Sequence, residues 1–126
     1  MRLKQVLQLA GLSITITAVG GFAGCNPCAV EVSERAISPD GTWTATILTR
    51  ECGATTSEYS AVNLQDTQQK VLDPKNEVFL AKHIHRLHVF WNGNDGLTIQ
   101  CENCSADEVE KKIQKLGPIQ ITYHGA

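Results

Sequence analysis

Apolar and polar residues alternate along most of the chain after residue 28, which is the pattern of half-buried β-strands. The segment Trp43–Thr49 is rich in aromatic and β-branched residues, and Ile119–Tyr123 alternates three apolar residues with two polar ones. The same criteria predict seven strands in all: Ala29–Ala36, Trp43–Thr49, Tyr59–Leu64, Val78–Ala81, Leu87–Trp91, Leu97–Gln100 and Ile119–Tyr123.

Turn-forming residues separate several of these strands. In the Ser-Pro-Asp-Gly sequence at 38–41, proline restricts φ at the second turn position and glycine closes the turn. The Asp-Pro-Lys-Asn sequence at 73–76 predicts another turn, and Asn92–Gly96 predicts a hairpin loop because Asn, Asp and Gly tolerate positive φ.

One segment near the C-terminus has a helical pattern instead. Ser105 and Glu108 have the spacing of a capping box, which satisfies free backbone N–H groups at a helix start. Three apolar residues follow at helical spacing, Val109, Ile113 and Leu116, before a Gly-Pro stop at 117–118. The pattern predicts a helix over about 105–116, and so an α+β fold: a mostly antiparallel β-sheet with one C-terminal helix packed on it.

The N-terminus predicts export and lipid attachment. Arg2 and Lys4 precede an uncharged run, and small residues lead to Cys25, as in a signal peptide that ends at a bacterial lipoprotein cysteine. We therefore expect residues 1–24 to be removed, Cys25 to be lipidated and palmitoylated, and residues 25–126 to form a single domain in the periplasm-facing cell envelope, with the outer membrane preferred. An uncleaved membrane anchor is the alternative.

The charge of the chain argues against two classes of partner. Without Arg2 and Lys4 the chain has nine basic and thirteen acidic side chains, a net charge of −4. No cluster of lysines and arginines is present, which excludes nucleic acid as an expected partner. The acidic balance also disfavours attraction to anionic lipid headgroups.

Four cysteines remain after Cys25, and an even number in an exported chain predicts disulfides. Three pairings are open, of which we favour Cys28–Cys52 and Cys101–Cys104. Cys28 precedes the first predicted strand and Cys52 follows the second, so a hairpin brings them together. Cys101 and Cys104 are close enough in sequence to pair locally.

Two groups of residues point weakly to redox or metal chemistry. Cys101 and Cys104 form a C-x-x-C motif before the predicted helix, although Glu102 opposes thiolate formation. His83 and His85 would share one face of a strand, with His88 on the other. His83 and His85 need a third ligand, His124 or a carboxylate, to hold Zn²⁺ or Cu²⁺. No spacing is diagnostic, so no metal and no cofactor is expected.

The segment Cys52–Ser57 is rich in small and hydroxyl residues and suggests a tight loop rather than a nucleophile, since no activating base is evident. If a binding surface exists, we expect it around this loop, because binding residues concentrate on rigidly held loops. Its candidate residues are Arg50, Glu51, Thr55, Thr56, Glu58 and Tyr59.

The chain resembles a group of small bacterial exported lipoproteins that carry an SPDG turn followed by a Cys-Gly-Ala-Thr-Thr segment. The matching sequences here are SPDGTWTATILTRECGATTSEYSAVNL, VFWNGNDGLTIQC and GPIQITY, which cover most of the chain after Cys25. The resemblance implies an envelope location and no particular activity.

Together these features favour a disulfide-containing envelope lipoprotein without a catalytic constellation. The leading hypothesis is a non-enzymatic module, of the inhibitor or immunity type, that binds another envelope or secreted protein. The alternative is a redox or metal-handling module that uses Cys101 and Cys104 or His83 and His85.

Overall fold

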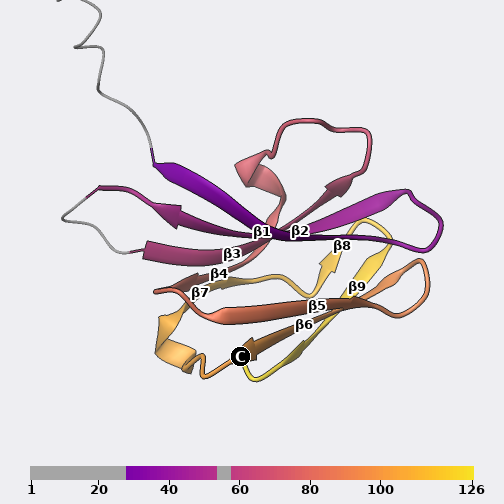
Figure 1. Ribbon diagram of the computed structural model, residues 1–126. Helices are drawn as coiled ribbons and strands as arrows, with labels where there is room; N and C mark the ends of the chain where they lie inside the picture. Colours follow the sequence, from indigo (N-terminus) through magenta and orange to yellow (C-terminus); the bar gives the residue numbers. More distant parts are fainter. Residues whose placement is uncertain (1–27, 54–57) are drawn as a thin grey trace, which may run out of the picture.

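The computed structural model describes residues 28–53 and 58–126, which form two β-sheets stacked as layers (Figure 1). The five-stranded sheet has the order β1-β2-β3-β4-β7 and the four-stranded sheet the order β5-β6-β9-β8. The strands are β1 (Ala29–Ile37), β2 (Trp43–Glu51), β3 (Glu58–Asp66), β4 (Glu77–Lys82), β5 (Arg86–Trp91), β6 (Gly96–Glu102), β7 (Val109–Lys112), β8 (Lys115–Leu116) and β9 (Ile119–His124). Two single 3₁₀ turns, η1 (Pro74–Asn76) and η2 (Ala106–Glu108), complete the elements.

All seven predicted strands are present, with ends that differ by a few residues. The predicted turn at 38–41 is also confirmed, because the Gly41 N–H donates to the Ser38 carbonyl at 2.8 Å with φ of 79° at Gly41. The sheets are antiparallel except at one place. Strand β9 pairs with β6 in parallel, which the alternation pattern gave no means to foresee.

One apolar core lies between the layers and draws residues from both sheets. Phe79 of β4 and Tyr123 of β9 face each other across it, with ring centroids 5.8 Å apart. The Tyr123 hydroxyl lies 2.5 Å from the Ile113 carbonyl and 3.1 Å from the Val78 carbonyl. Burial raises the pKa of Tyr123. This side chain therefore joins the two layers by packing and by hydrogen bonding.

The predicted C-terminal helix is wrong, and with it the α+β class. The described residues contain no helix of seven residues or more, and the fold is almost entirely β-sheet. The expected helix is instead η2 followed by β7 and β8. Val109 and Ile113 are four residues apart, a spacing that fits the period of a strand as well as that of a helix.

Tertiary pairing explains why the strand conformation prevails. Strand β7 adds to the edge of β4 and satisfies its backbone groups, while β8 pairs with β9 in the other sheet. The segment thus crosses from one sheet to the other, and a helix docked on one face would leave the edge of β4 unpaired. Val109, Ile113 and Leu116 still pack against the core, as their apolar character predicted.

The structure has the disulfides Cys28–Cys52 and Cys101–Cys104, which is the favoured pairing. The first links the start of β1 to the end of β2, and the second closes the turn after β6. The predicted signal segment 1–24 and the lipidation site Cys25 lie outside the described residues. Within residues 28–53 and 58–126 no helix is long and apolar enough to cross a membrane.

Candidate metal site at one end of the sandwich

The turn between β4 and β5 carries two histidines, His83 and His85. His83 has a φ of 74°, a left-handed conformation that is uncommon outside glycine and is held here by neighbouring groups. The buried Ser60 hydroxyl donates to the His83 carbonyl at 2.8 Å and accepts from the His85 N–H at 2.7 Å. The His83 N–H donates to the Glu58 carbonyl at 2.6 Å. Strand β3 therefore holds the backbone at both histidines.

Glu108, the last residue of η2, reaches the same place from another part of the chain. Its Oε1 accepts from the Ser105 N–H at 3.1 Å and from the Ser105 hydroxyl at 3.0 Å. The Ser105 backbone bond, followed by the contact with His83 and the Ser105 hydroxyl bond, lowers the pKa of Glu108 to about 2. The carboxylate is therefore ionised at neutral pH and oriented toward the histidines.

The three side chains meet at short distances. His83 Nδ1 lies 2.7 Å from Glu108 Oε2, and His85 Nε2 lies 3.4 Å from Glu108 Oε1. One ligand atom from each residue lies within 4.8 Å of the other two. His85 and Glu108 are 9% and 21% exposed, whereas His83 is 63% exposed, so the cluster is open to solvent on one side. Two imidazoles and a carboxylate are a ligand set for Zn²⁺ that leaves a fourth position open.

The cluster differs from the sequence prediction in one respect. His83 and His85 lie in the turn after β4 rather than on a strand, so backbone curvature and not strand alternation brings their rings together. The third group is the carboxylate of Glu108, which is one of the two kinds of third ligand that the sequence left open. His124, at the exposed end of β9, is in neither group of potential ligands found among the described residues.

Glu108 was recognised from the sequence only as a capping residue. The capping box with Ser105 does form, but on a single 3₁₀ turn, and it orients the carboxylate. The combination of a histidine pair and a capping box carried no information about their distance. His88, on β5, has a carboxylate partner of its own in Glu102, with Nε2 and Oε2 3.2 Å apart.

The C-x-x-C disulfide lies beside this cluster. His85 and the sulfur atoms of Cys101 and Cys104 form a second group whose ligand atoms lie within 4.8 Å of one another. Cys101 is buried at 2% exposure, and Cys104 is half-buried. The turn between them places Asn103 at φ 62°, a conformation that Asn tolerates better than most residues. The two residue groups proposed separately from the sequence therefore share His85.

The predicted binding surface lies at the end of β2 and the start of β3, where the Glu58 carbonyl accepts from the His83 N–H. Arg50 pairs in register with Tyr59, and Glu51 with Glu58. The Arg50 guanidinium forms an ion pair with the buried Glu77 of β4, which engages it within the protein. Thr55 and Thr56 lie outside the described residues.

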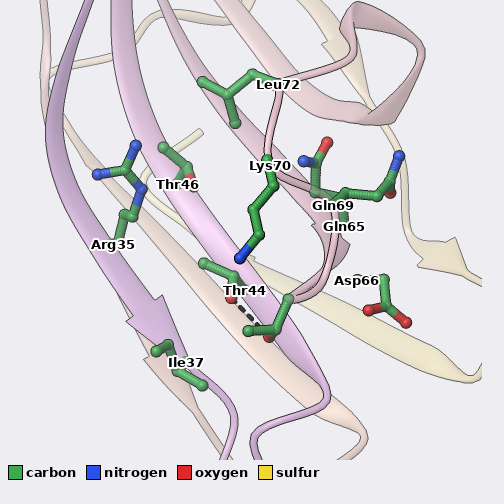
Figure 2. Close-up of a pocket in the computed structure, with 10 residues that line it drawn as sticks. Arg35, Ile37, Thr44, Thr46, Gln65, Asp66, Gln69, Lys70 and Leu72 are labelled. Carbon is green, nitrogen blue, oxygen red and sulfur yellow. Dashed lines mark hydrogen bonds between the residues drawn. The ribbon is translucent and has the colours of Figure 1, made fainter.

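A hollow of about 170 Å³ lies on the outer face of the five-stranded sheet, beneath the connection from β3 to η1 (Figure 2). Lys70 extends from that connection toward Thr44, and Arg35 lies on the β1 side. The polar groups between them are engaged: the Gln65 amide donates to the Val71 carbonyl at 3.0 Å, and the Thr44 and Thr67 hydroxyls are 2.8 Å apart. The exposed side chains of Arg35 and Lys70 remain available. Two cations are a weaker basis for a binding site than the histidine cluster.

Comparison with known proteins assigns neither a family nor a function to this chain. The chain matches no protein-family model, and searches of the curated proteins and of the solved structures returned no match.

Proposed function

We propose that this chain is an exported, lipid-anchored envelope protein that binds a divalent transition metal, with Zn²⁺ as the probe, through His83, His85 and Glu108. The observation that carries the proposal is the convergence of one ligand atom from each of these residues to within 4.8 Å of the other two. Export and anchoring through Cys25 rest on the N-terminal sequence.

Two further features support a site built for binding. Residues outside the cluster hold parts of it in place: Ser60 holds the backbone at both histidines, and Ser105 holds the Glu108 carboxylate. Such supporting hydrogen bonds keep metal ligands in position before the ion arrives. The lowered pKa of Glu108 keeps the carboxylate charged, which is the form that binds cations.

The chemistry of binding follows from these contacts. His85 Nε2 lies 2.9 Å from the Lys82 carbonyl, which accepts only, so this nitrogen carries the proton in the metal-free protein. Ligation through Nε2 needs its lone pair, so the proton of the neutral imidazole would move to Nδ1 when Zn²⁺ binds. Binding would therefore switch the tautomer of His85 and break its contact with Lys82.

The test is titration of the purified full chain with Zn²⁺ by calorimetry. We expect one bound ion, and we expect Glu108→Gln and His85→Ala each to weaken binding by more than roughly tenfold, because each removes a direct ligand. His88→Ala and Glu102→Gln are matched controls: they disrupt a histidine–carboxylate pair that has only one imidazole. Absence of binding, or equal loss in the controls, would contradict the proposal. Cu²⁺ in the same titration tests selectivity.

Binding of another protein is a second candidate, supported by apolar side chains on the outer face of the five-stranded sheet. Val30 and Ile37 project from β1 and are 52% and 56% exposed, and Val71, on the connection above that face, is 78% exposed. Exposed apolar side chains on one face of a sheet can take part in an interaction surface.

This candidate is tested by cross-linking in intact cells that express the full chain. We expect Ile37→Asp and Val71→Asp to abolish a specific cross-linked adduct and to leave Zn²⁺ binding unchanged. Phe90, which is 51% exposed on β5 in the other sheet, offers the control Phe90→Asp. An adduct that survives both substitutions would exclude this face as the docking surface.

A further inference from the structure

The disulfide Cys101–Cys104 lies within ligand distance of the same imidazole that completes the metal site. His85 belongs to both groups: with His83 and Glu108 in one, and with the two sulfur atoms in the other. A disulfide sulfur is a poor metal ligand, whereas a thiolate is a strong one for Zn²⁺. The oxidation state of this pair therefore decides how many strong ligands surround His85.

We propose that reduction of Cys101–Cys104 by a dithiol converts the site into one that includes two thiolates and binds Zn²⁺ more tightly, so that metal affinity is under redox control. This inference rests on the proposed metal-binding function and adds its regulation. In the oxidised protein the ligands are two imidazoles and one carboxylate. In the reduced protein Cys101 and Cys104 join His85, and Glu108 or His83 supplies the fourth ligand.

The backbone is arranged to keep the sulfur atoms in place after the bond breaks. Cys101 is held in β6, opposite Leu87 of β5. Gly125 packs so closely on the Cys101 carbonyl that a side chain there would collide with it. The Cα atoms of the two cysteines are 5.8 Å apart, a separation set by the turn at Asn103. The position of Cys101 near His85 therefore does not depend on the disulfide alone.

The redox step balances as a thiol–disulfide exchange. A thiolate of the dithiol attacks Cys104 Sγ, the less buried sulfur, and Cys101 leaves as a thiolate. The second thiol of the reductant then attacks the mixed disulfide at the reductant's sulfur and releases Cys104. The protein gains two electrons and two protons, and the dithiol becomes a cyclic disulfide. Zn²⁺ then displaces the two thiol protons to solvent.

The experiment compares Zn²⁺ affinity of the oxidised and reduced full chain, measured by competition with a chromogenic chelator after the reductant is removed under argon. We expect reduction to raise the affinity at least about tenfold, since thiolates are stronger zinc ligands than the groups they supplement. In Cys101→Ser/Cys104→Ser we expect no increase, although Cys28–Cys52 is reduced in both proteins. This variant therefore separates the two disulfides.

Cobalt(II) provides a second measurement on the unmodified chain. A thiolate-to-cobalt charge-transfer band should appear only in the reduced protein, and its intensity should fall in His85→Ala. Oxidised protein that binds Zn²⁺, with an affinity that reduction leaves unchanged and with no cobalt band, would overturn this inference and leave the proposed function standing. Oxidised protein that binds no Zn²⁺ would contradict the proposed function itself. An increase that persists in the double serine variant would also overturn the inference, because it would place the effect at Cys28–Cys52.

Discussion

The two disulfides of this protein lie in regions with different roles. Cys28–Cys52 joins residues 24 apart and ties the start of β1 to the end of β2, whereas Cys101–Cys104 joins residues three apart and lies against His85. Near the first, the charged groups Arg50 and Glu77 neutralise each other within the protein. Near the second, Glu108 faces two imidazoles. The same kind of covalent bond thus links two strand ends in one region and lies beside a cluster of potential metal ligands in the other.

The largest difference between the regions should appear in stability. Cys28→Ser/Cys52→Ser should lower the free energy of unfolding by about 3.5 kcal/mol, because the bond closes a long loop in the unfolded chain. Urea denaturation followed by circular dichroism measures this change. Zn²⁺ affinity of the folded fraction should remain as in the unmodified protein, and a large loss of affinity would contradict the separation of roles.

The second disulfide should contribute less to stability. Cys101→Ser/Cys104→Ser should cost about 2 kcal/mol, because the short loop that it closes has less conformational entropy in the unfolded state. The same urea titration gives the value. A cost equal to or greater than that of the Cys28–Cys52 variant would show that the bond beside His85 is a structural element of the same kind.

Two serines, Ser60 and Ser33, allow a matched comparison in which single side-chain hydrogen bonds are removed. Ser60→Ala should lower the free energy of unfolding by about 1.5 kcal/mol and weaken Zn²⁺ binding, since it leaves the His83 carbonyl and the His85 N–H without their partner. Ser33, in β1, donates to the Ile47 carbonyl at 3.3 Å and lies in an exposed position. Ser33→Ala is therefore the control, with a smaller cost in stability and no effect on Zn²⁺ binding.

The smallest expected effect is the pH dependence that Glu108 contributes to stability. Its pKa is about 2 in the folded protein against an ordinary value of 4.5, so it contributes stability that is present above about pH 4.5 and lost as the pH falls toward 2. With metal removed by a chelator, Glu108→Gln should reduce the change in melting temperature across that interval, and the part contributed by Asp40, whose pKa the Thr42 N–H also lowers, should remain. Glu102→Gln provides the control for a surface carboxylate beside histidine, and an equal reduction there would contradict a special role for Glu108.

Sequence patterns that span only a few residues predicted the strands well. Alternation located seven strands, and the Ser-Pro-Asp-Gly turn and both disulfides formed as the local sequence indicated. The segment 105–116 was assigned wrongly because the spacing between Val109 and Ile113 fits both periods. Its conformation depends on an unpaired edge of β4, which lies some thirty positions earlier in the chain and whose exposure no local pattern reports.

The candidate site, too, could be predicted only in part. The types of its residues were visible in the sequence, as a histidine pair, a C-x-x-C motif and a capping glutamate. Their proximity was not, because His83 and Glu108 are 25 residues apart and meet only when β7 adds to β4 and η2 turns toward the β4–β5 connection. Backbone propensity and side-chain chemistry are properties of neighbours along the chain. Which distant groups share one coordination sphere depends on the pairing of strands, and that pairing minimises the free energy of the whole fold.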